Sequence, residues 1–170
     1  MKILLLGNPN VGKSVVFSRL TGVHVISSNY PGTTVGYTKG FMRFRDERAD
    51  VIDVPGTYTL DPTCEAERVA REMLEEGDVA IDVVDATNLE RNLYLTSQLL
   101  ELEIPLVLAL NVSDSARSQG IRIDKARLST LLGGAPIVET VGHRGAGVDE
   151  LVRAAAGLTG LGRVRMELVA

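Results

Sequence analysis

A glycine-rich loop near the amino terminus constrains this chain more than any other feature. The loop runs from Gly7 to Ser14 with the sequence GNPNVGKS, after the apolar run 3–6 and before a helical pattern. This is the strand–loop–helix setting of the phosphate-binding motif G-x-x-x-x-G-K-[S/T], although a chance glycine turn is the alternative. Small residues let backbone N–H groups approach phosphate oxygens, and the positive end of the helix adds to the attraction. The spacing predicts that Lys13 contacts the β- and γ-phosphates and that the Ser14 hydroxyl binds Mg²⁺.

The size and composition of the chain fit one soluble domain. It has 170 residues, 45% hydrophobic and 24% charged, which is enough for a single sizeable core. The formal net charge of −4 argues against broad binding of nucleic acid. Cys64, the single cysteine, excludes an internal disulfide framework and fits a reducing compartment. No run reaches the roughly 18 apolar residues of a membrane span, and the first strand follows Met1 too closely for a signal peptide.

Apolar runs alternate with helical patterns along the chain, which is typical of an α/β fold with a largely parallel sheet. We expect three layers, αβα, around a six-stranded sheet with one antiparallel strand contributed by a hairpin whose tip is 45–48. The strands are expected at 2–7, 36–44, 49–54, 79–84, 106–110 and 136–139. The helices are expected at 13–21, 65–76, 89–102, 124–132 and 148–156, with Leu89, Leu93 and Leu100 on the buried face of the third. Residues 23–35 show no sustained period and are expected to form a mobile loop.

Asp53 and Gly56 form a second motif, Asp-Val-Pro-Gly, at the end of a predicted strand. A carboxylate about forty residues after a phosphate loop commonly holds Mg²⁺ through water in this class of nucleotide-binding protein. Gly56 tolerates the dihedral angles that would turn its N–H group toward the γ-phosphate. Alone, the motif is more often a turn after a strand, but its spacing from the first motif favours the metal-site interpretation.

Asn111 and Asp114 follow the strand predicted at 106–110. A carboxylate at Asp114 accepts both N1–H and N2–H₂ of guanine, and adenine offers no matching pair of donors. Asn111 is then expected to brace the phosphate loop. The alternative is a helix cap, because Asn and Asp are common where a strand leads into a helix. Val112 stands where the pattern Asn-Lys-x-Asp has lysine, which shortens the aliphatic stem that packs on the base.

The loop after Pro31 supplies candidate switch residues, Gly32, Thr33 and Thr34. A threonine hydroxyl there completes the Mg²⁺ shell only when the γ-phosphate is present, which makes the loop an order–disorder switch. Thr34 is the preferred ligand. Without the other motifs, threonines in a turn would simply face solvent.

Together these motifs describe a Ras-like P-loop GTPase domain, and longer segments resemble one family. Residues 7–14, 29–35, 53–60 and, above all, 84–96 (VDATNLERNLYLT) are similar to the N-terminal G domain of FeoB, the prokaryotic ferrous iron transporter. The resemblance covers about 1–156. It implies a G domain at 1–157, followed by a tail, 158–170, that begins a missing helical domain. It also implies a cytosolic position on the inner membrane, as part of a longer membrane protein.

The resemblance further implies how the site works. Asn10 matches an asparagine that helps to bind a K⁺ ion, whose charge accelerates GTP hydrolysis in place of an arginine finger. Thr57 stands where Ras-type enzymes have a glutamine, so slow intrinsic turnover to GDP and phosphate is expected. Val141-Gly142 replaces the usual Ser-Ala of the guanine-supporting loop, which leaves the N–H group of Gly142 to meet guanine O6. Catalytic roles fall to Lys13, Asn10, Thr34 and Gly56.

The motifs and the resemblance assign a wide set of contacts. Mg²⁺ is assigned to Ser14, Thr34 and Asp53. The nucleotide is assigned to Asn8, Asn10, Val11, Gly12, Lys13, Ser14, Val15, Gly32, Thr33, Thr34, Asp53, Gly56, Asn111, Val112, Asp114, Val141, Gly142 and His143. The expected partners are guanine nucleotide, the membrane domain of the same protein and a small FeoA-like protein, with no nucleic acid. A homo-oligomer is also compatible with the sequence.

Three functions are compatible with the sequence. The first is an enzyme that hydrolyses GTP and thereby gates ferrous iron uptake. The second is a nucleotide-dependent switch whose hydrolysis is incidental, and the third is a K⁺-dependent GTPase of ribosome or tRNA assembly. His24, His143 and Cys64 invite an iron-ligand interpretation, but they lack ligand spacing and are expected to be structural or exposed.

Overall fold

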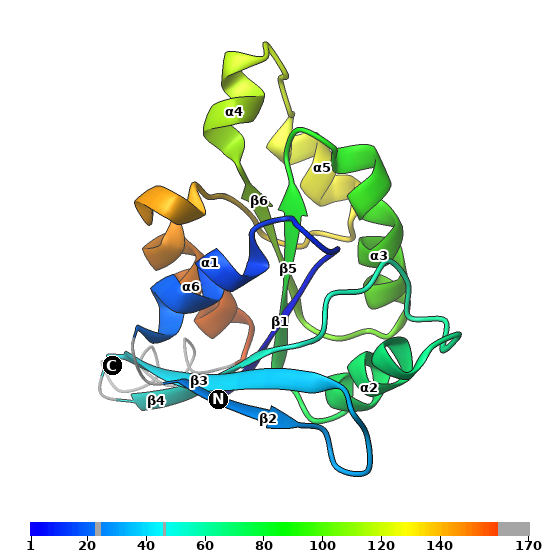
Figure 1. Cartoon of the computed structure of the whole chain (residues 1–170). Coiled ribbons are helices and arrows are strands. Elements are labelled where there is room, and N and C mark those ends of the chain that lie inside the picture. The colour runs from blue at the N-terminus through cyan, green and yellow to red at the C-terminus, as the bar shows by residue number, and fades with distance from the viewer. Residues whose placement is uncertain (23–24, 46, 160–170) are drawn as a thin grey trace, which may run out of the picture.

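The computed structural model describes residues 1–22, 25–45 and 47–159 (Figure 1). The strands are β1 (Lys2–Leu6), β2 (Val25–Asn29), β3 (Gly36–Phe44), β4 (Glu47–Asp53), β5 (Val79–Asp85), β6 (Leu106–Asn111) and β7 (Ile137–Glu139). The α-helices are α1 (Lys13–Thr21), α2 (Glu65–Leu74), α3 (Leu89–Glu101), α4 (Ser113–Ser118), α5 (Lys125–Leu131) and α6 (Val148–Leu158), with a 3₁₀ turn, η1, at Gly142–Arg144. Some predictions concern residues outside these ranges: His24, Asp46 in the predicted hairpin tip, and 160–170 in the predicted tail.

The sheet confirms the predicted fold class. Its strand order is β2-β3-β4-β1-β5-β6-β7, and β3 runs antiparallel to both of its neighbours. The other pairings, β4–β1, β1–β5, β5–β6 and β6–β7, are parallel. The prediction of one antiparallel strand is therefore confirmed, but the prediction of six strands is wrong, because the described sheet has seven.

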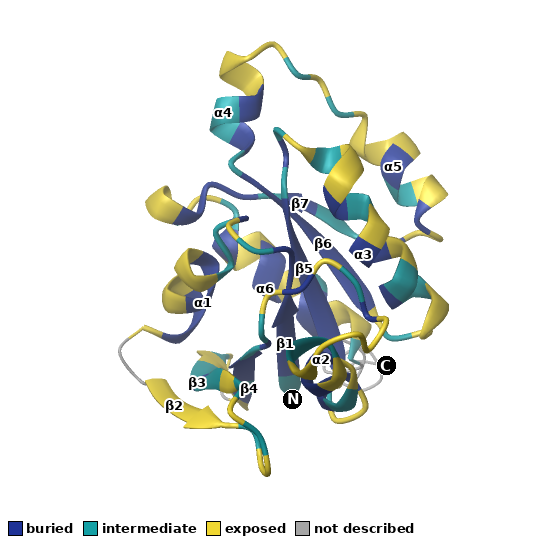
Figure 2. Cartoon of the chain, turned by 45° about the vertical axis from the view of Figure 1, so that its right-hand side comes forward, coloured by how far each residue is buried: buried dark blue, intermediate teal, exposed yellow. Residues whose placement is uncertain are grey.

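The additional strand is β2, in a stretch that was predicted to be an irregular loop. Each of its five residues, VISSN, is exposed, so the sequence carries no pattern of buried positions (Figure 2). The strand is held by its antiparallel pairing with β3, from Val25 opposite Gly40 to Asn29 opposite Gly36. An edge strand stabilised mainly by backbone hydrogen bonds leaves little trace in hydrophobic periodicity.

Alternate residues of the central strands face two different helical layers. In β1, Ile3 and Leu5 pack in the cluster that contains residues of α1 and α6. Leu4 and Leu6 pack in the opposite cluster, with residues of α2 and α3. This two-residue alternation produces the three layers that were predicted, with helices on both faces of the sheet (Figure 1).

Two local predictions about helices are wrong. Leu89, Leu93 and Leu100 were expected to form the buried face of α3, but they are only partly buried and pack at the edge of a third cluster, against α4 and α5. The buried residues of α3 are Asn92, Leu95, Thr96 and Leu99, because polar groups of this helix turn inward toward β5. Helix α4 was not predicted, since its six residues, SDSARS, have no amphipathic pattern.

One of those inward contacts places an acid in the core. Asp82 of β5 is fully buried, and its Oδ2 accepts a hydrogen bond of 2.6 Å from Thr96 Oγ1. Its Oδ1 has no hydrogen-bond partner among the described residues. Burial raises the pKa of Asp82 to about 6, because an ionised carboxylate is poorly solvated there.

None of the helices in the described part of the chain is long and apolar enough to cross a membrane.

Candidate functional site

The motif residues gather at the carboxyl ends of the parallel strands, on one edge of the sheet. We call the loop 7–14, with Asp53 and Gly56, the phosphate half of the site. We call residues 111–114, with the loop 141–145, the base half. In an open α/β sheet this edge is where ligands bind, because the loops there converge from several strands.

The phosphate half presents a run of unpaired backbone donors. Apart from Pro9, each residue between Asn8 and Ser14 has a backbone N–H group that makes no hydrogen bond within the described residues. The first intrahelical bonds of α1 are donated by Val15 and Val16, each at 3.1 Å to Gly12 O. A curved backbone with inward-pointing free N–H groups at a helix start is an anion-binding nest.

Gly12 is required where this loop meets the base half. Its φ of +86° lies in the left-handed region, and a Cβ atom would come within 2.4 Å of Asn111 Nδ2. Asn111 Nδ2 instead donates a 2.9 Å hydrogen bond to Val11 O. This contact confirms the expected bracing of the phosphate loop by Asn111.

Lys13 and Asp53, which were assigned to the phosphates and to Mg²⁺, contact each other in the structure. The Lys13 ammonium forms an ion pair with Asp53 and donates a 2.6 Å hydrogen bond to Val54 O. Both side chains are largely buried, at 11% and 13% exposure. Asp53 reaches this position because β4 lies beside β1, with Asp53 opposite Leu5. The lysine predicted to bind phosphate and the carboxylate predicted to hold a metal thus pair with each other.

Gly56 and Thr57 lie in the loop that follows Asp53, next to the phosphate loop. A Cβ atom at Gly56 would lie 3.5 Å from Pro9 N, so the glycine borders the phosphate loop. Thr57 is buried, and its hydroxyl donates to Thr59 O at 2.7 Å. The Thr57 side chain is therefore occupied within its own loop.

The segment 30–35 lies against α2, where Thr34 is engaged. Its hydroxyl donates to Glu65 Oε2 at 3.1 Å, while Thr33 Oγ1 donates to Tyr30 O at 2.9 Å and closes the turn. Burial, followed by the nearby Glu72 carboxylate, raises the pKa of Tyr30 above its ordinary value. Thr34, which was predicted to bind Mg²⁺, thus contacts α2.

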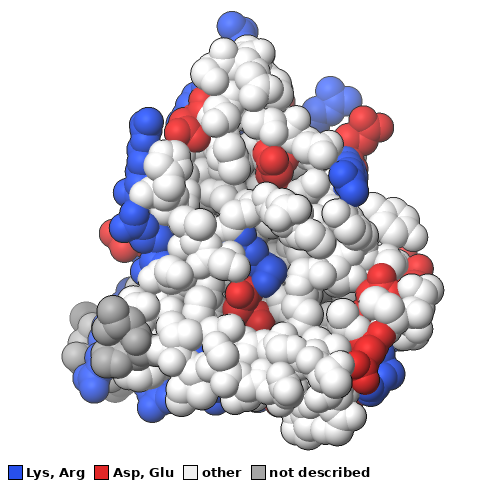
Figure 3. Space-filling view, viewed as in Figure 1, with Lys and Arg blue, Asp and Glu red and all other residues white. Residues whose placement is uncertain are grey.

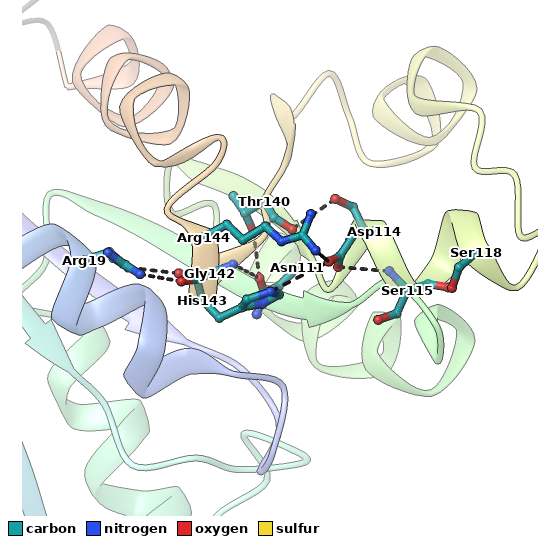
Figure 4. A network of polar contacts seen from close by, with 10 residues as sticks. Arg19, Asn111, Asp114, Ser115, Ser118, Thr140, Gly142, His143 and Arg144 are labelled. Carbon is teal, nitrogen blue, oxygen red and sulfur yellow. Dashed lines mark hydrogen bonds and ion pairs between the residues drawn. The ribbon is translucent and has the colours of Figure 1, made fainter.

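The base half is centred on the buried Asn111 side chain (Figure 4). Its Oδ1 accepts hydrogen bonds from Gly142 N at 3.0 Å and Thr140 Oγ1 at 3.1 Å. Gly142 is buried, and a Cβ atom on it would lie 3.3 Å from a methyl group of Val15. The Gly142 N–H group, predicted to donate to guanine, is thus already paired with Asn111.

Asp114 lies beside two side chains of the other segment of this half. Its Oδ2 is 3.9 Å from both His143 Nε2 and Arg144 Nη2, and its Oδ1 accepts from Ser115 N at 2.9 Å (Figure 4). The carboxylate is 23% exposed. Val112 precedes it with φ 59° and ψ 27°, a left-handed conformation that a β-branched residue rarely adopts.

Two side chains that motif analysis missed also hold the site loops. Gln98 of α3 accepts from Leu60 N at 2.8 Å and from Thr59 Oγ1 at 3.1 Å. Arg19 of α1 donates to Gly142 O at 3.1 Å and also to His143 O. Neither belongs to a recognisable motif, because each is one polar residue on an amphipathic helix, and no sequence signal marks its partner.

The face that carries the site has no large field of one charge. Figure 3 shows basic and acidic groups interspersed among uncharged residues. Cys64 is exposed at the start of α2, and no group of three or more His, Cys, Asp or Glu side chains within the described ranges is arranged to hold a metal. His143 and Cys64 are both exposed, which is one of the two environments predicted for them.

Comparison with known proteins identifies the family. The family model of ferrous iron transport protein B matches residues 1–155. The Fe(2+) transporter FeoB of Salmonella typhimurium is 45% identical over 157 residues, which cover 89% of this chain and 20% of the relative. A Fe(2+) transport protein A/FeoB fusion protein of Porphyromonas gingivalis is 44% identical over 154 residues, or 89% of this chain and 18% of that protein. The chain thus spans about a fifth of these relatives.

Solved structures agree with the sequence relatives. A mutant of S. thermophilus NFeoB bound to GDP superposes with a TM-score of 0.88 at 42% identity, covering 94% of this chain and 63% of that one. The FeoB G domain of Methanococcus jannaschii gives a TM-score of 0.81 at 39% identity, with 93% and 96% covered. The chain therefore belongs to the FeoB family of ferrous iron transport proteins, whose G domain it comprises.

Proposed function

We propose that this domain binds GTP, hydrolyses it slowly with Mg²⁺, and so regulates ferrous iron uptake by a longer membrane protein. The observation that carries the proposal is the run of unpaired N–H groups from Asn8 to Ser14, braced on Asn111. The GDP bound to the S. thermophilus neighbour supports a guanine nucleotide as the ligand.

The phosphates would replace the ion pair at the phosphate half. Lys13 would turn from Asp53 to the β- and γ-phosphates, because a triphosphate carries more charge than one carboxylate. The donors present fit Mg²⁺, which prefers hard oxygen ligands. The Ser14 hydroxyl is exposed with no described partner, and Asp53 lies beside Lys13. Ser14, Asp53 and a relocated Thr34 would hold the ion, which neutralises phosphate charge.

The guanine ring would occupy the base half. Asp114 would accept N1–H and N2–H₂, with the side chains of Val15, Val112 and His143 around the ring. Since Gly142 N already donates to Asn111, its contact with guanine O6 would have to be shared. Val141 is buried and has no hydroxyl to add.

Hydrolysis would depend on Asn10, Gly56 and the switch loop 32–34. Asn10 is exposed at the tip of the phosphate loop with a left-handed φ of 69°, which presents its amide outward. A K⁺ ion held there would offset charge that develops on the phosphates. Slow turnover is expected because the Thr57 hydroxyl is engaged within its loop and is not free to orient water.

The test compares GTP turnover in K⁺ and in Na⁺, for the wild type and for Asn10→Ala. We expect faster turnover in K⁺, on the order of ten-fold, and loss of this difference in Asn10→Ala. The matched control is Asn88→Ala, since the Asn88 side chain is exposed and makes no capping bond. Equal wild-type rates in the two salts would remove the K⁺ role, and no turnover in either would remove the enzymatic one.

A second function, a switch whose hydrolysis is incidental, is favoured by the contact between Thr34 and Glu65. Capture of Thr34 by a metal would break this contact and so signal to α2 without hydrolysis. Iron uptake by the full-length protein with GTP, compared with a nonhydrolysable analogue, separates the two. Equal uptake with both nucleotides would leave the switch and eliminate coupling to hydrolysis.

The partners follow from the length of the relatives. We propose that residues 1–157 form the G domain, that 158–170 lead into a further domain, and that the whole lies on the cytoplasmic face of the membrane. A membrane domain of the same protein is the main partner. The fusion in P. gingivalis supports contact with a protein like transport protein A. Homo-oligomers, and the absence of nucleic acid binding, remain predictions.

A further inference from the structure

We propose that Arg19 is a positioning residue, which ties the base half of the site to α1 and thereby slows nucleotide release. The inference rests on the proposed function, because it assumes that guanine nucleotide occupies this site. It adds a residue outside the nucleotide-binding motifs.

The contact uses two arms of one guanidinium group. Arg19 Nε donates to Gly142 O at 3.1 Å, and Nη2 donates to the next carbonyl, His143 O (Figure 4). The aliphatic stem also lies along the loop, because a Cβ atom at Gly145 would be 3.8 Å from Arg19 Cδ. A planar fork that binds two successive carbonyls fixes the orientation of the turn, which one donor cannot do.

The turn that Arg19 holds has few other restraints. It consists of the short 3₁₀ turn η1, closed by an isolated bridge between Val141 and Ala146. Asn111 binds it from the buried side through Gly142 N. Arg19 binds it from the opposite, more exposed side, so that the loop is gripped between two side chains.

The position of Arg19 on α1 links this grip to the phosphates. Helix α1 begins at Lys13, and Arg19 lies less than two turns further along the same helix. Asn111 connects the base half to the phosphate loop at Val11. Arg19 provides a second connection, from the base half to α1. The two ends of the nucleotide would then sit on one mechanically connected unit.

The same turn carries the side chains that flank Asp114. His143 Nε2 and Arg144 Nη2 each lie 3.9 Å from Asp114 Oδ2. Without Arg19, the turn keeps its hydrogen bond to Asn111 and its packing against Val15, but two of its carbonyl groups lose their restraint and the turn gains freedom to move. The base-reading carboxylate and its neighbours would then lose their fixed arrangement, and the base would leave more readily.

The experiment measures release of a fluorescent GDP analogue from the 170-residue chain by chase with unlabelled GDP. We expect Arg19→Leu to release it roughly ten-fold faster, the effect of two hydrogen bonds at a partly exposed site. The release rate of Arg19→Lys, which has one donor group, should lie between those of the wild type and Arg19→Leu. The single-turnover rate of GTP hydrolysis at saturation should change by less than about two-fold, because the phosphate half keeps its own contacts.

The matched control is Arg153→Leu, since Arg153 is an exposed arginine of α6 whose side chain makes no hydrogen bond or ion pair with described residues. It should release GDP at the wild-type rate. Wild-type release by Arg19→Leu would overturn the proposal while the nucleotide site stands. A parallel loss of the hydrolytic rate in Arg19→Leu would also overturn it, by revealing a general structural role. Failure of the wild type to bind GDP would instead refute the proposed function.

Discussion

The two halves of the site differ in how the chain builds them. In the phosphate half, one short loop between β1 and α1 supplies N–H groups that have no partner within the described part of the chain. In the base half, two segments about thirty residues apart are joined through the Asn111 side chain, and Arg19 of α1 holds the second of these segments. The proposed phosphate binding would therefore be encoded locally, in spacing and glycines, whereas the proposed base recognition would depend on tertiary contacts.

This contrast predicts that a change in the base half alters selectivity while phosphate binding survives. Replacing Asp114 with Asn should weaken GTP binding by about 100-fold or more, because an amide cannot accept from both guanine donors. Binding of inorganic tripolyphosphate should be retained, since Lys13 and the loop are untouched. Competition titration against a fluorescent GDP analogue measures both.

Xanthine nucleotide provides a chemical control for Asp114→Asn. Xanthine has a carbonyl where guanine has an amino group, so the amide N–H₂ of the variant gains an acceptor. XTP should therefore bind the variant better than GTP does. Undiminished preference for GTP over ATP in Asp114→Asn would show that the base half does not read guanine through this carboxylate.

The same contrast explains how much could be predicted from the sequence. The parallel core, the antiparallel β3 and the bracing of the phosphate loop by Asn111 followed from hydrophobic runs and motif spacing. β2 was missed because an exposed edge strand has no buried period. Arg19 was missed because nothing in its neighbours in the sequence indicates carbonyl groups 123 and 124 positions away.

Another prediction concerns the buried acid Asp82, which lies in the sheet between the two halves. Asp82 of β5 pairs with Leu6 of β1 and Leu108 of β6, between the strands that lead into the two halves. Burial raises its pKa from 3.8 to about 6, so the folded state holds the proton more tightly than the unfolded chain. The stability from this group is fully present below about pH 4 and is lost as the pH rises through 6.

Asp82→Asn removes that titration. Relative to the variant, the wild type should lose at most about 3 kcal/mol of unfolding free energy between pH 4 and pH 7.5, at about 1.4 kcal/mol per pH unit. Urea denaturation at both pH values measures it, and the difference between them cancels any constant cost of the buried amide. Thr96→Val should enlarge the total loss by extending it to higher pH, because the Thr96 hydroxyl lowers this pKa. Parallel wild-type and Asp82→Asn curves would contradict the assignment.

The smallest predicted effect tests whether strain is confined to the base half. Val112 has a left-handed backbone, which costs a β-branched residue about 1 kcal/mol or more, whereas asparagine tolerates it. Val112→Asn should therefore raise the unfolding free energy by about 1 kcal/mol in urea denaturation. Val112→Ile keeps the branched Cβ and should bring no gain. In the phosphate half, a glycine, Gly12 at φ +86°, precedes the helix at the comparable position. If Val112→Asn and Val112→Ile are equally stable, the Val112 conformation stores no strain, and the base half is no more strained than the phosphate half.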